Sequence, residues 1–554
     1  MNKNVFTLIA ERIETWYDVT IFFQRAYLPR FPNQQEGGNL YSIVSTAIVF
    51  GIQSVFVQVE ADVCDGMPAF EMVGALSSEV KEAKERVKAA FRNSKIQLAP
   101  KRITVNFYPA DIRKTGTSFD LPIALAVLSA YGRVSKECLK GIIFAGEVSL
   151  NGEIRPTTGI LPMALAAQEV GKHTICVPRE NMKEARVVKG MVVLPADNLN
   201  QVIAMIEEFS HMPEKYQADA KRNQTAQKAE HAVEWDFAGI HGQKVLKRVC
   251  EVAASGRHHM LMIGAPGAGK TMAARAAATI LPDLTEEEAL ELAKIYSVSG
   301  RFEQREERFW ERPFRNPHHT ISVAGLAGGG AVPKPGELSL AHKGILFLDE
   351  LTEFKREVLE TLRQPLEERM IRLVRSSGVY HYPADVMLIG AMNPCGCGAY
   401  PDHNKCTCSP AVIGRHWNKL SKPLLDRMDL TIEVKRLSLV DMVSTEPQET
   451  SEAVKKRVQD VQNLQRKRFA GSGIVSNSRI PVSQIKEFCP MEQEAEKLLQ
   501  EYFERLEMSA RSYYRTIRVA RTIADMEHSK RICRRHMIES LRYRGMDRKT
   551  WEMI

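Results

Sequence analysis

Apolar residues follow two different spacings along the first part of the chain. Between residues 40 and 209, short runs rich in β-branched residues alternate with stretches in which apolar residues recur every three to four positions. The first spacing is typical of buried strands and the second of amphipathic helices, so this region is predicted to be one α/β domain. The expected strands are a buried pair in Ser42–Val59, then Ile103–Phe107, Ile142–Ala145 and Thr174–Val177, and the expected helices include Ser78–Arg92 and Leu121–Tyr131.

Downstream of this domain the pattern changes twice. Residues 210–233 are polar and poor in large apolar side chains, which indicates a linker. Residues 234–435 return to alternating strand and helix patterns, whereas residues 436–554 show only helical spacing, for example at Leu498 and Tyr502. The predicted fold class is therefore multidomain α/β, with two α/β domains followed by a helical domain.

Composition narrows the class of protein without identifying it. The 554 residues are 44% hydrophobic and 26% charged, which excludes a wholly disordered, collagenous or coiled-coil chain. Ten cysteines are too few for a disulfide scaffold. The most apolar stretch, Ile43–Val59, is interrupted by polar residues, and acidic side chains near the start argue against a secretory signal. We therefore expect a cytoplasmic protein that does not enter the membrane.

Positive charge is concentrated at the C-terminus. Lys and Arg number 76 against 67 Asp and Glu, and from Arg511 to the end there are twelve basic and five acidic residues. Such a segment can attract the phosphate backbone of a nucleic acid, and it can equally be the solvated face of a helix.

A phosphate-binding motif opens the second α/β domain. The run Gly264–Thr271 fits G-x-x-x-x-G-K-T, follows an apolar run expected to be a strand, and precedes strong helix formers. In such a loop the backbone N–H groups converge on phosphates, the lysine binds the β- and γ-phosphates, and the hydroxyl ligates Mg²⁺. The predicted nucleotide-binding residues are Gly264, Pro266, Gly267, Gly269, Lys270 and Thr271.

Two later strands end in polar side chains of the kind that hydrolysis requires. Asp349 and Glu350 follow four apolar residues, and Asn393 follows the apolar run that starts at Val386. Asp349 is expected to ligate Mg²⁺, and Glu350 to act as the base that orients and polarises water. Asn393 is expected to bind the γ-phosphate or the attacking water. Together with the phosphate loop, these residues predict ATP hydrolysis.

The arrangement of these motifs resembles the AAA+ ATPases and, more narrowly, the magnesium-chelatase-like proteins of the YifB/ComM family. The resemblance covers about Tyr41 to the C-terminus. It implies an N-terminal Lon-like domain of the ribosomal S5 type, an AAA+ P-loop core and a C-terminal helical lid. Besides the motif spacing, the stretches that carry it are Tyr41–Ala47, Arg312–Ser322, Leu362–Glu367, Leu424–Leu430 and Ser509–Arg511.

Residues 1–39 precede this resemblance and end in the turn-forming run Pro32–Gly38. Family members typically begin near Tyr41. Two interpretations therefore stay open, a disordered extension and a start site placed too far upstream, and no function is assigned to these residues.

The resemblance also assigns residues to the nucleotide. Arg427 matches the arginine finger, which would reach the γ-phosphate held by a neighbouring subunit, and Asn393 matches the sensor-1 position. Arg511 matches the sensor-2 position of the lid, with Arg515 and Arg518 as nearby alternatives. An arginine there would stabilise charge on the transferred phosphoryl group, whereas a surface ion pair is the alternative for each.

Two further segments match elements that project into the central pore of an AAA+ ring. Gly325–Gly336 is too rich in glycine and proline for a packed element, and it corresponds to the helix-2 insert. Met370–Tyr382 is predicted to be a hairpin around Ser376–Gly378 that carries Arg372 and Arg375. These arginines are candidate contacts to a DNA backbone, and packing between subunits is an equal alternative.

Four cysteines crowd into an insert at residues 395–408. Four thiolates on a short loop can hold Zn²⁺, and four reduced structural cysteines are the alternative. His318 and His319 also invite a metal interpretation, but a loop-capping role is the expectation. The cysteines have the spacing C-x-C-x8-C-x-C and are Cys395, Cys397, Cys406 and Cys408.

The N-terminal domain contains a protease-like motif without its base. Lys114–Asp120 and the helix after it are similar to the serine segment of Lon-type proteases, in which a lysine activates the serine. The position expected for that lysine is Leu161, so Ser118 is predicted to lack a base. Subunit assembly and DNA handling remain as roles for this domain.

The resemblance implies a hexameric motor that hydrolyses ATP with Mg²⁺ and acts on DNA. Its implied task is branch migration in homologous recombination during natural transformation, with recombination proteins as possible partners. Two alternatives stay open, a motor that remodels a protein partner and a chelatase that inserts Mg²⁺ into a porphyrin. Nothing in the sequence suggests a tetrapyrrole pocket.

Overall fold

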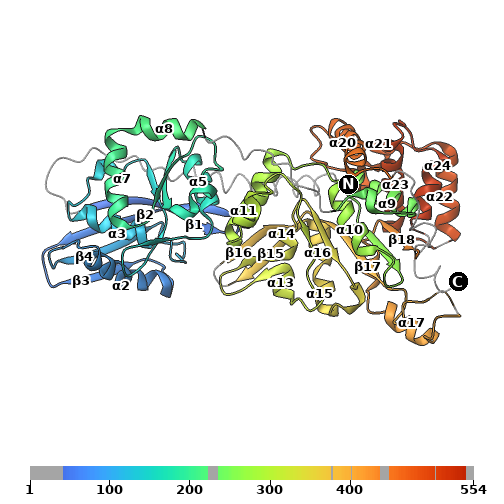
Figure 1. Cartoon of the computed structure of the whole chain (residues 1–554), viewed down its shortest axis with the longest axis horizontal. Helices are drawn as coiled ribbons and strands as arrows, with labels where there is room; N and C mark the ends of the chain where they lie inside the picture. The colour runs from blue at the N-terminus through green and yellow to red at the C-terminus, as the bar shows by residue number, and fades with distance from the viewer. Residues whose placement is uncertain are drawn as a thin grey trace, which may run out of the picture.

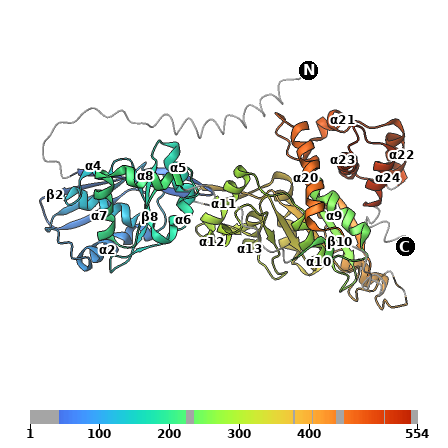
Figure 2. The ribbon, with the colours of Figure 1, turned by 45° about the horizontal axis from the view of Figure 1, so that its top comes forward.

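The computed structural model describes residues 41–222, 235–375, 378–400, 402, 404–436, 448–505 and 507–544. Three parts follow one another along its longest axis: a sheet with its helices, a second sheet with its helices, and a helical part (Figure 1). A view turned by 45° shows the same order (Figure 2). In the described parts of the chain, no helix is both long and apolar enough to cross a membrane.

The N-terminal part is built on a seven-stranded mixed sheet with the order β3-β4-β2-β1-β5-β8-β9. The long hairpin β1–β2 and the pair β2–β4 are antiparallel, and the remaining neighbours are parallel. The strands are β1 (Tyr41–Phe50), β2 (Gln53–Cys64), β3 (Ala69–Val73), β4 (Arg102–Tyr108), β5 (Ile142–Phe144), β8 (Thr174–Pro178) and β9 (Val192–Ala196), with a small ribbon of β6 (Glu147–Val148) and β7 (Ile154–Arg155). Each strand predicted for this domain is present.

Helices cover this first sheet. Helix α3 is buried along its whole length because it packs against β1 and β2, which explains why its sequence is apolar on every side. The predicted helices Ser78–Arg92 and Leu121–Tyr131 correspond to α2 and α3, with ends shifted by one residue. The helices are α2 (Ser78–Asn93), α3 (Asp120–Ala130), α4 (Lys136–Leu139), α5 (Ile160–Glu169), α6 (Met182–Ala185), α7 (Leu199–His211) and α8 (Pro213–Arg222).

The second sheet is parallel, with five strands in the order β11-β14-β17-β10-β18. Strands β10, β14 and β17 are completely buried, which accounts for their continuous apolar sequences. The strands are β10 (Met260–Gly264), β11 (Phe314–Arg315), β14 (Ile345–Leu348), β17 (Met387–Met392) and β18 (Leu430–Val434). The helices are α9 (Lys244–Gly256), α10 (Lys270–Thr279), α11 (Glu286–Ser299), α12 (Glu303–Glu306), α13 (Val323–Ala327), α14 (Glu337–Leu340), α15 (Arg356–Thr361), α16 (Arg363–Glu368), α17 (Pro410–Trp417) and α18 (Lys422–Leu425).

The C-terminal part is helical, as predicted. Its longest helices, α20 and α23, pack against α9 of the second part and against each other. The elements are α20 (Ser451–Arg468), α21 (Ile485–Phe488), α22 (Gln493–Arg505), α23 (Ala510–Met526) and α24 (Arg534–Arg542).

One expectation about an irregular segment was wrong, and another segment contains a helix that was not predicted. The first part of the predicted linker 210–233 is helical, since α7 ends at His211 and α8 follows directly; residues 223–233 lie outside the described residues. The glycine-rich segment Gly325–Gly336 is packed rather than open, because it contains the end of α13 and a ribbon of β12 (Gly328–Gly329) and β13 (Lys334–Pro335). Its glycines permit close backbone approach: a β-carbon on Gly336 would lie 2.4 Å from the Gly328 nitrogen.

The first two parts share a hydrophobic core. Helix α11, which begins with a capping box at Thr285 and Glu288, packs against α5 of the N-terminal part. The N-terminal sheet is therefore docked on the second part through buried apolar surface, and not only joined to it by the chain. The shared cluster includes Ala47, Ile143, Ile160, Leu161 and Ala164 from one side and Ala289, Leu292, Ala293, Ile295 and Tyr296 from the other.

Candidate functional site

Three adjacent strands of the second sheet end at one edge. Strand β17 lies between β14 and β10, and all three run parallel, so the residues that follow them meet at the carboxyl edge. Ligands of open α/β sheets bind at this edge. The structure thus places the phosphate loop beside the polar side chains that follow β14 and β17.

The loop between β10 and α10 has the form that a chain of phosphates needs. Gly267 and Gly269 have φ angles of +75° and +87°, and the space where their β-carbons would lie is open. Gly269 precedes the first turn of α10, whose N–H groups face an anion favourably. Gly264 serves the packing instead, because a β-carbon there would lie 2.3 Å from the Val434 carbonyl oxygen.

Lys270 points its ammonium group into this loop. Its Nζ donates hydrogen bonds to the carbonyl oxygens of Gly264 at 2.7 Å and Ala265 at 3.1 Å, and to Asn393 Oδ1 at 3.0 Å. Burial lowers the pKa of Lys270, while Asp349 and Glu350 oppose that shift. A phosphate oxygen would offer this half-desolvated cation a charged partner.

The hydroxyl and carboxylate expected to hold Mg²⁺ are in contact. Thr271 Oγ1 donates to Asp349 Oδ2 at 2.6 Å. Both groups supply the oxygen ligands that Mg²⁺ prefers, and both lie beside the phosphate loop, so the site fits this ion.

Glu350 stands at the rim with an uncommon backbone. Its φ is +50°, in the left-handed region that non-glycine residues seldom adopt, and its side chain is 59% exposed. Its backbone N–H donates to Asp349 Oδ1 at 2.9 Å, which helps to hold this turn. The carboxylate therefore faces solvent at the mouth of the site, where a water-activating base is needed.

His319 lies next to Glu350, and the sequence did not predict this proximity. Its Nδ1 lies 3.7 Å from Glu350 Oε2, and its ring packs 4.1 Å from that of His318. His318 Nδ1 lies 2.9 Å from Thr320 Oγ1 within the same loop, in line with the expected loop-capping role. The pair therefore lines the rim beside the predicted base.

Asn393 is fixed from behind by α17. His416 Nε2 lies 3.0 Å from the Asn393 carbonyl oxygen, and Trp417 Nε1 donates to the Pro394 carbonyl at 3.0 Å. The amide of Asn393 is thereby held towards Lys270. Strand position alone could suggest a polar residue here, but not the helix that supports it.

The predicted arginines Arg427 and Arg511 meet at a different place, around Glu367. Arg427 is buried, and it pairs with Glu367 at 2.9 Å and donates to the Arg363 carbonyl at 3.0 Å. Arg511 pairs with the same carboxylate at 2.6 Å. Both arginines are therefore occupied within their own chain, through a residue to which sequence reasoning gave no role.

A buried ion pair ties the Arg427 segment to the lid. Arg515 of α23 donates to Asp429 Oδ1 at 2.5 Å and to the carbonyl oxygen of Arg427. Burial would raise the pKa of Asp429, but Arg515 and His258 outweigh it and hold the pKa well below its ordinary range. Arg518, the other alternative for sensor 2, donates instead to the Ile480 carbonyl at 2.9 Å. The pair Asp429–Arg515 is thus placed to position Arg427.

The predicted hairpin is present as β15 (Met370–Arg375) and β16 (Gly378–Pro383), paired antiparallel. Ser376 and Ser377 of its predicted turn lie outside the described residues. Arg372 and Arg375 are both exposed, and Arg375 Nε donates to the Gly330 carbonyl of the glycine-rich segment at 3.4 Å. The hairpin therefore presents positive charge beside that segment.

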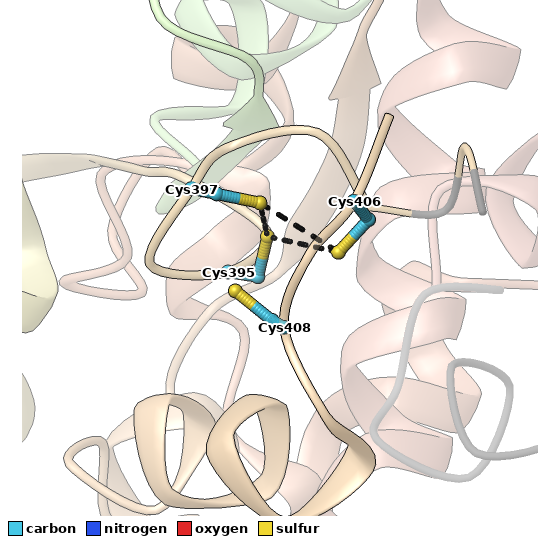
Figure 3. A group of neighbouring side chains, drawn as sticks. All are labelled: Cys395, Cys397, Cys406 and Cys408. Atoms are coloured by element: carbon cyan, nitrogen blue, oxygen red, sulfur yellow. Dashed lines mark hydrogen bonds between the residues drawn. The ribbon is translucent and has the colours of Figure 1, made fainter. Parts of the chain in front are cut away.

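The four cysteines predicted as a zinc site lie together (Figure 3). Their sulfur atoms are all within 4.8 Å of one another, and three pairs are separated by 3.3 to 3.8 Å. Tetrahedral zinc thiolates hold sulfurs about 3.8 Å apart, so this donor set fits Zn²⁺. A hydrogen bond from the Ala399 backbone, with one from Cys395, lowers the pKa of Cys397 to about 6. A backbone hydrogen bond from Cys408 lowers the pKa of Cys406, but burial and the neighbouring thiols outweigh it and raise that pKa to about 12, so Cys397 loses its proton before Cys406.

The protease-like motif of the N-terminal part has no matching geometry. Leu161, at the position expected for the lysine base, is completely buried in the core shared with α11. The nearby Lys114 donates to the Pro109 carbonyl, and burial lowers its pKa. Ser118 is buried as well, with 7% exposure. Among the residues that the structure describes, the side chains needed for peptidase chemistry are not assembled at this motif.

Comparison with protein-family models and with individual relatives shows which proteins this chain is similar to. Its segments match three family models: residues 59–181 the subunit ChlI of Mg-chelatase, residues 236–442 the magnesium chelatase subunit ChlI, and residues 448–544 the C-terminal region of that subunit. It is 27% identical over 197 residues to the Lon protease of Mycolicibacterium smegmatis, which covers 33% of this chain and 25% of that protein.

Two relatives match nearly from end to end. The chain is 39% identical over 509 residues to the uncharacterized protein YifB of Escherichia coli K12, covering 92% of this chain and 97% of that protein. It is 38% identical over 512 residues to the competence protein ComM of Haemophilus influenzae, covering 92% and 98%. The phosphate loop and carboxylates described above belong to the P-loop core of such proteins, which bind ATP and Mg²⁺. The chain is therefore a member of the YifB/ComM family of magnesium-chelatase-like AAA+ ATPases.

Proposed function

We propose that this ATPase is a ring-forming motor, a hexamer by family resemblance, that moves along DNA and drives branch migration. The observation that carries the proposal is the combination of a phosphate site at one edge of the second sheet with exposed basic side chains on a hairpin of the same part. Lys270 would bind the β- and γ-phosphates, and Thr271 with Asp349 would hold Mg²⁺. The likeness to a protein named for competence supports a role in the recombination step of natural transformation.

Each residue has a defined part in the proposed hydrolysis. Glu350 orients and polarises the attacking water, and Asn393 holds the γ-phosphate or that water from the neighbouring strand. Arg427 would leave Glu367 and stabilise the phosphoryl charge in the site of the adjacent subunit, which makes turnover depend on assembly. Arg511 would contribute a second positive charge from the lid.

The proposal includes Zn²⁺ on the four-cysteine insert. The insert directly follows Asn393, and it packs on the phosphate loop, since a β-carbon on Gly398 would lie 2.4 Å from Pro266. When bound, the metal would link the two ends of the insert through its four cysteines.

The experiment that tests the proposal is branch migration of a fluorescently labelled four-way DNA junction in the presence of Mg²⁺ and ATP. Dissociation of the junction is expected with ATP and not with a non-hydrolysable analogue. The variant with Arg372 and Arg375 both changed to Ala should bind the junction less tightly and with a shallower salt dependence. A chain that hydrolyses ATP but ignores every DNA offered would instead favour a motor for a protein partner or a chelatase.

A further inference from the structure

The N-terminal sheet touches the basic hairpin directly. The turn between β1 and β2 extends away from its own domain and reaches β16, where the rings of Phe50 and Tyr380 stack with centroids 4.4 Å apart and planes 25° apart. Gly51, at the tip of that turn, has a φ of +66°, and a β-carbon on it would lie 3.2 Å from the His381 carbonyl oxygen. The approach of the two backbones is therefore close enough to favour glycine.

This contact lies at the end of the hairpin that carries Arg375. Gly378 is opposite Arg375 in the strand register, and a β-carbon on Gly378 would lie 2.7 Å from the Cζ atom of Phe50. The Phe50 ring thus covers the face of Gly378 as well as Tyr380. One aromatic side chain of the N-terminal part supports the hairpin at the level of its outermost arginine.

The hairpin needs such support. A two-stranded ribbon is only marginally stable by itself, so its direction is set by what packs on it. One attachment is to the glycine-rich segment, where Tyr382 donates to the Pro333 carbonyl at 2.6 Å. Near the tip, Val374 remains 63% exposed. The ring of Phe50 provides a second attachment, from the N-terminal part.

The N-terminal part is itself firmly held and can therefore act as a support. Glu184, buried between the two parts, accepts hydrogen bonds from Leu161 N at 2.9 Å and from Ser297 Oγ of α11. The Gly159 N–H donates to the Ser297 carbonyl at 3.2 Å, beside the shared hydrophobic core. Because α5 packs on both β1 and β2, this hairpin is consequently fixed relative to the second sheet.

We propose that the β1–β2 turn is a positioning element, in which Phe50 and Gly51 hold the β15–β16 hairpin so that Arg372 and Arg375 face a polyanionic strand. The inference rests on the proposed DNA contact of that hairpin and gives the N-terminal part a role in it. Removal of the Phe50 ring leaves the Tyr380 and Gly378 faces uncovered. The hairpin then samples more orientations, and ordering it on DNA costs more conformational entropy.

The test compares Phe50→Ala, Tyr380→Ala and the double variant in the full-length chain. The measurements are the Kd for a fluorescein-labelled single-stranded oligonucleotide, the ATPase rate with and without that DNA, and the melting temperature. Each single variant is expected to weaken DNA binding by about three- to tenfold, the range expected for a stacked aromatic pair, with the basal ATPase rate unchanged. The double variant should be no weaker than the singles, because both changes remove one interaction.

Matched variants separate positioning from general destabilisation. Tyr380→Phe keeps the stacked ring and should keep the wild-type Kd, whereas Ile43→Ala, an exposed position on the same strand as Phe50, should leave the Kd unchanged. Phe50→Leu removes the stacked ring but keeps apolar volume, so it should also weaken DNA binding, and it covers the case in which the alanine variant does not fold. Additive losses, or a fall in basal ATPase that parallels the loss of DNA binding, would overturn the inference.

The Arg372→Ala, Arg375→Ala double variant distinguishes the two proposals. If it weakens DNA binding while Phe50→Ala and Phe50→Leu do not, the hairpin contacts DNA without this support, and the positioning role is wrong. If it binds DNA like the wild type, the proposed DNA contact itself fails, and the inference fails with it.

Discussion

The two α/β parts of this chain are built from similar elements and differ in what their strand ends carry. In the second part, three buried parallel strands bring Lys270, Asp349 and Asn393 to one edge within hydrogen-bonding reach of each other or of Thr271. In the N-terminal part, the protease-like segment places Ser118 near no assembled base, and the expected lysine position is a core leucine. A sheet of this kind is therefore a scaffold, and its chemistry depends on a few residues after the strands.

The largest effect is expected from Lys270→Ala, with Ser118→Ala as its counterpart in the other sheet. Loss of the ammonium removes the partner of the phosphates, so nucleotide affinity or turnover should fall by at least about 100-fold. Ser118→Ala should leave both unchanged. Binding of a fluorescent ATP analogue and phosphate release measure these effects. If Ser118→Ala reduced nucleotide affinity or turnover as much as Lys270→Ala does, the two sheets would not differ in their chemistry.

Arg427→Ala should be almost as severe for turnover but should spare binding. An arginine finger contributes roughly 10³-fold or more to phosphoryl transfer, and this arginine contacts Glu367 rather than the Lys270 cluster of its own chain. Mixing Arg427→Ala with Glu350→Gln subunits should restore part of the activity, because some subunit interfaces then combine an intact Arg427 with an intact Glu350. Mixtures as inactive as either variant alone would count against action between subunits. Arg363→Ala serves as a control, because the Arg363 side chain pairs with Glu360 and its loss should leave turnover unchanged.

A smaller effect is expected from loss of the four-cysteine site. The purified chain should contain about one zinc by elemental analysis, and Cys406→Ser should lose it and melt at a temperature several degrees lower. ATP turnover should fall more than ATP binding, since the insert follows Asn393 directly. Cys64→Ser, at an exposed cysteine outside the cluster, should keep both the metal and the stability. If the wild-type chain contained no metal after purification without chelators, the proposed zinc site would be wrong.

The smallest effect is expected from Glu367→Gln. Its carboxylate is 40% exposed and pairs with the buried Arg427 and with Arg511, which is 45% exposed. Arg427 keeps its hydrogen bonds to the carbonyl oxygens of Arg363 and Pro423, so loss of the carboxylate charge should cost only about 1 kcal/mol of stability. Unfolding should therefore change little, and turnover should stay within about fivefold of the wild type or rise as Arg427 is released. Glu368→Gln, one residue away, is the matched control. A collapse of turnover in Glu367→Gln alone would place this carboxylate in the catalytic machinery.

Much of the fold and the core of the site could be predicted because their signals are local. The phosphate loop is eight consecutive residues, and the carboxylates and Asn393 follow short apolar runs that are typical of buried strands. The grouping of the four cysteines could be predicted for the same reason, because the insert is short and brings their sulfur atoms together.

The remaining features depend on contacts between distant segments. Arg515 and Asp429 are 86 residues apart, and Arg511 and Glu367 are 144 apart, so no spacing pattern links them. His319 reaches Glu350 through the course of a loop. The helix in the predicted linker was missed because its sequence is mostly polar and charged, with Tyr216 as its one large apolar side chain. The glycine-rich segment packs through backbone contacts that composition does not reveal.

The central claim is that the carboxyl edge of the second sheet hydrolyses ATP with Glu350 as its base. The most direct measurement is phosphate release by the wild-type chain and by Glu350→Gln in the same buffer with Mg²⁺, beside the affinity of each for ATP. We expect ATP to bind equally well to both and turnover to fall by about 100-fold or more in the variant, the range for loss of a general base. Equal turnover by the two chains would contradict the account.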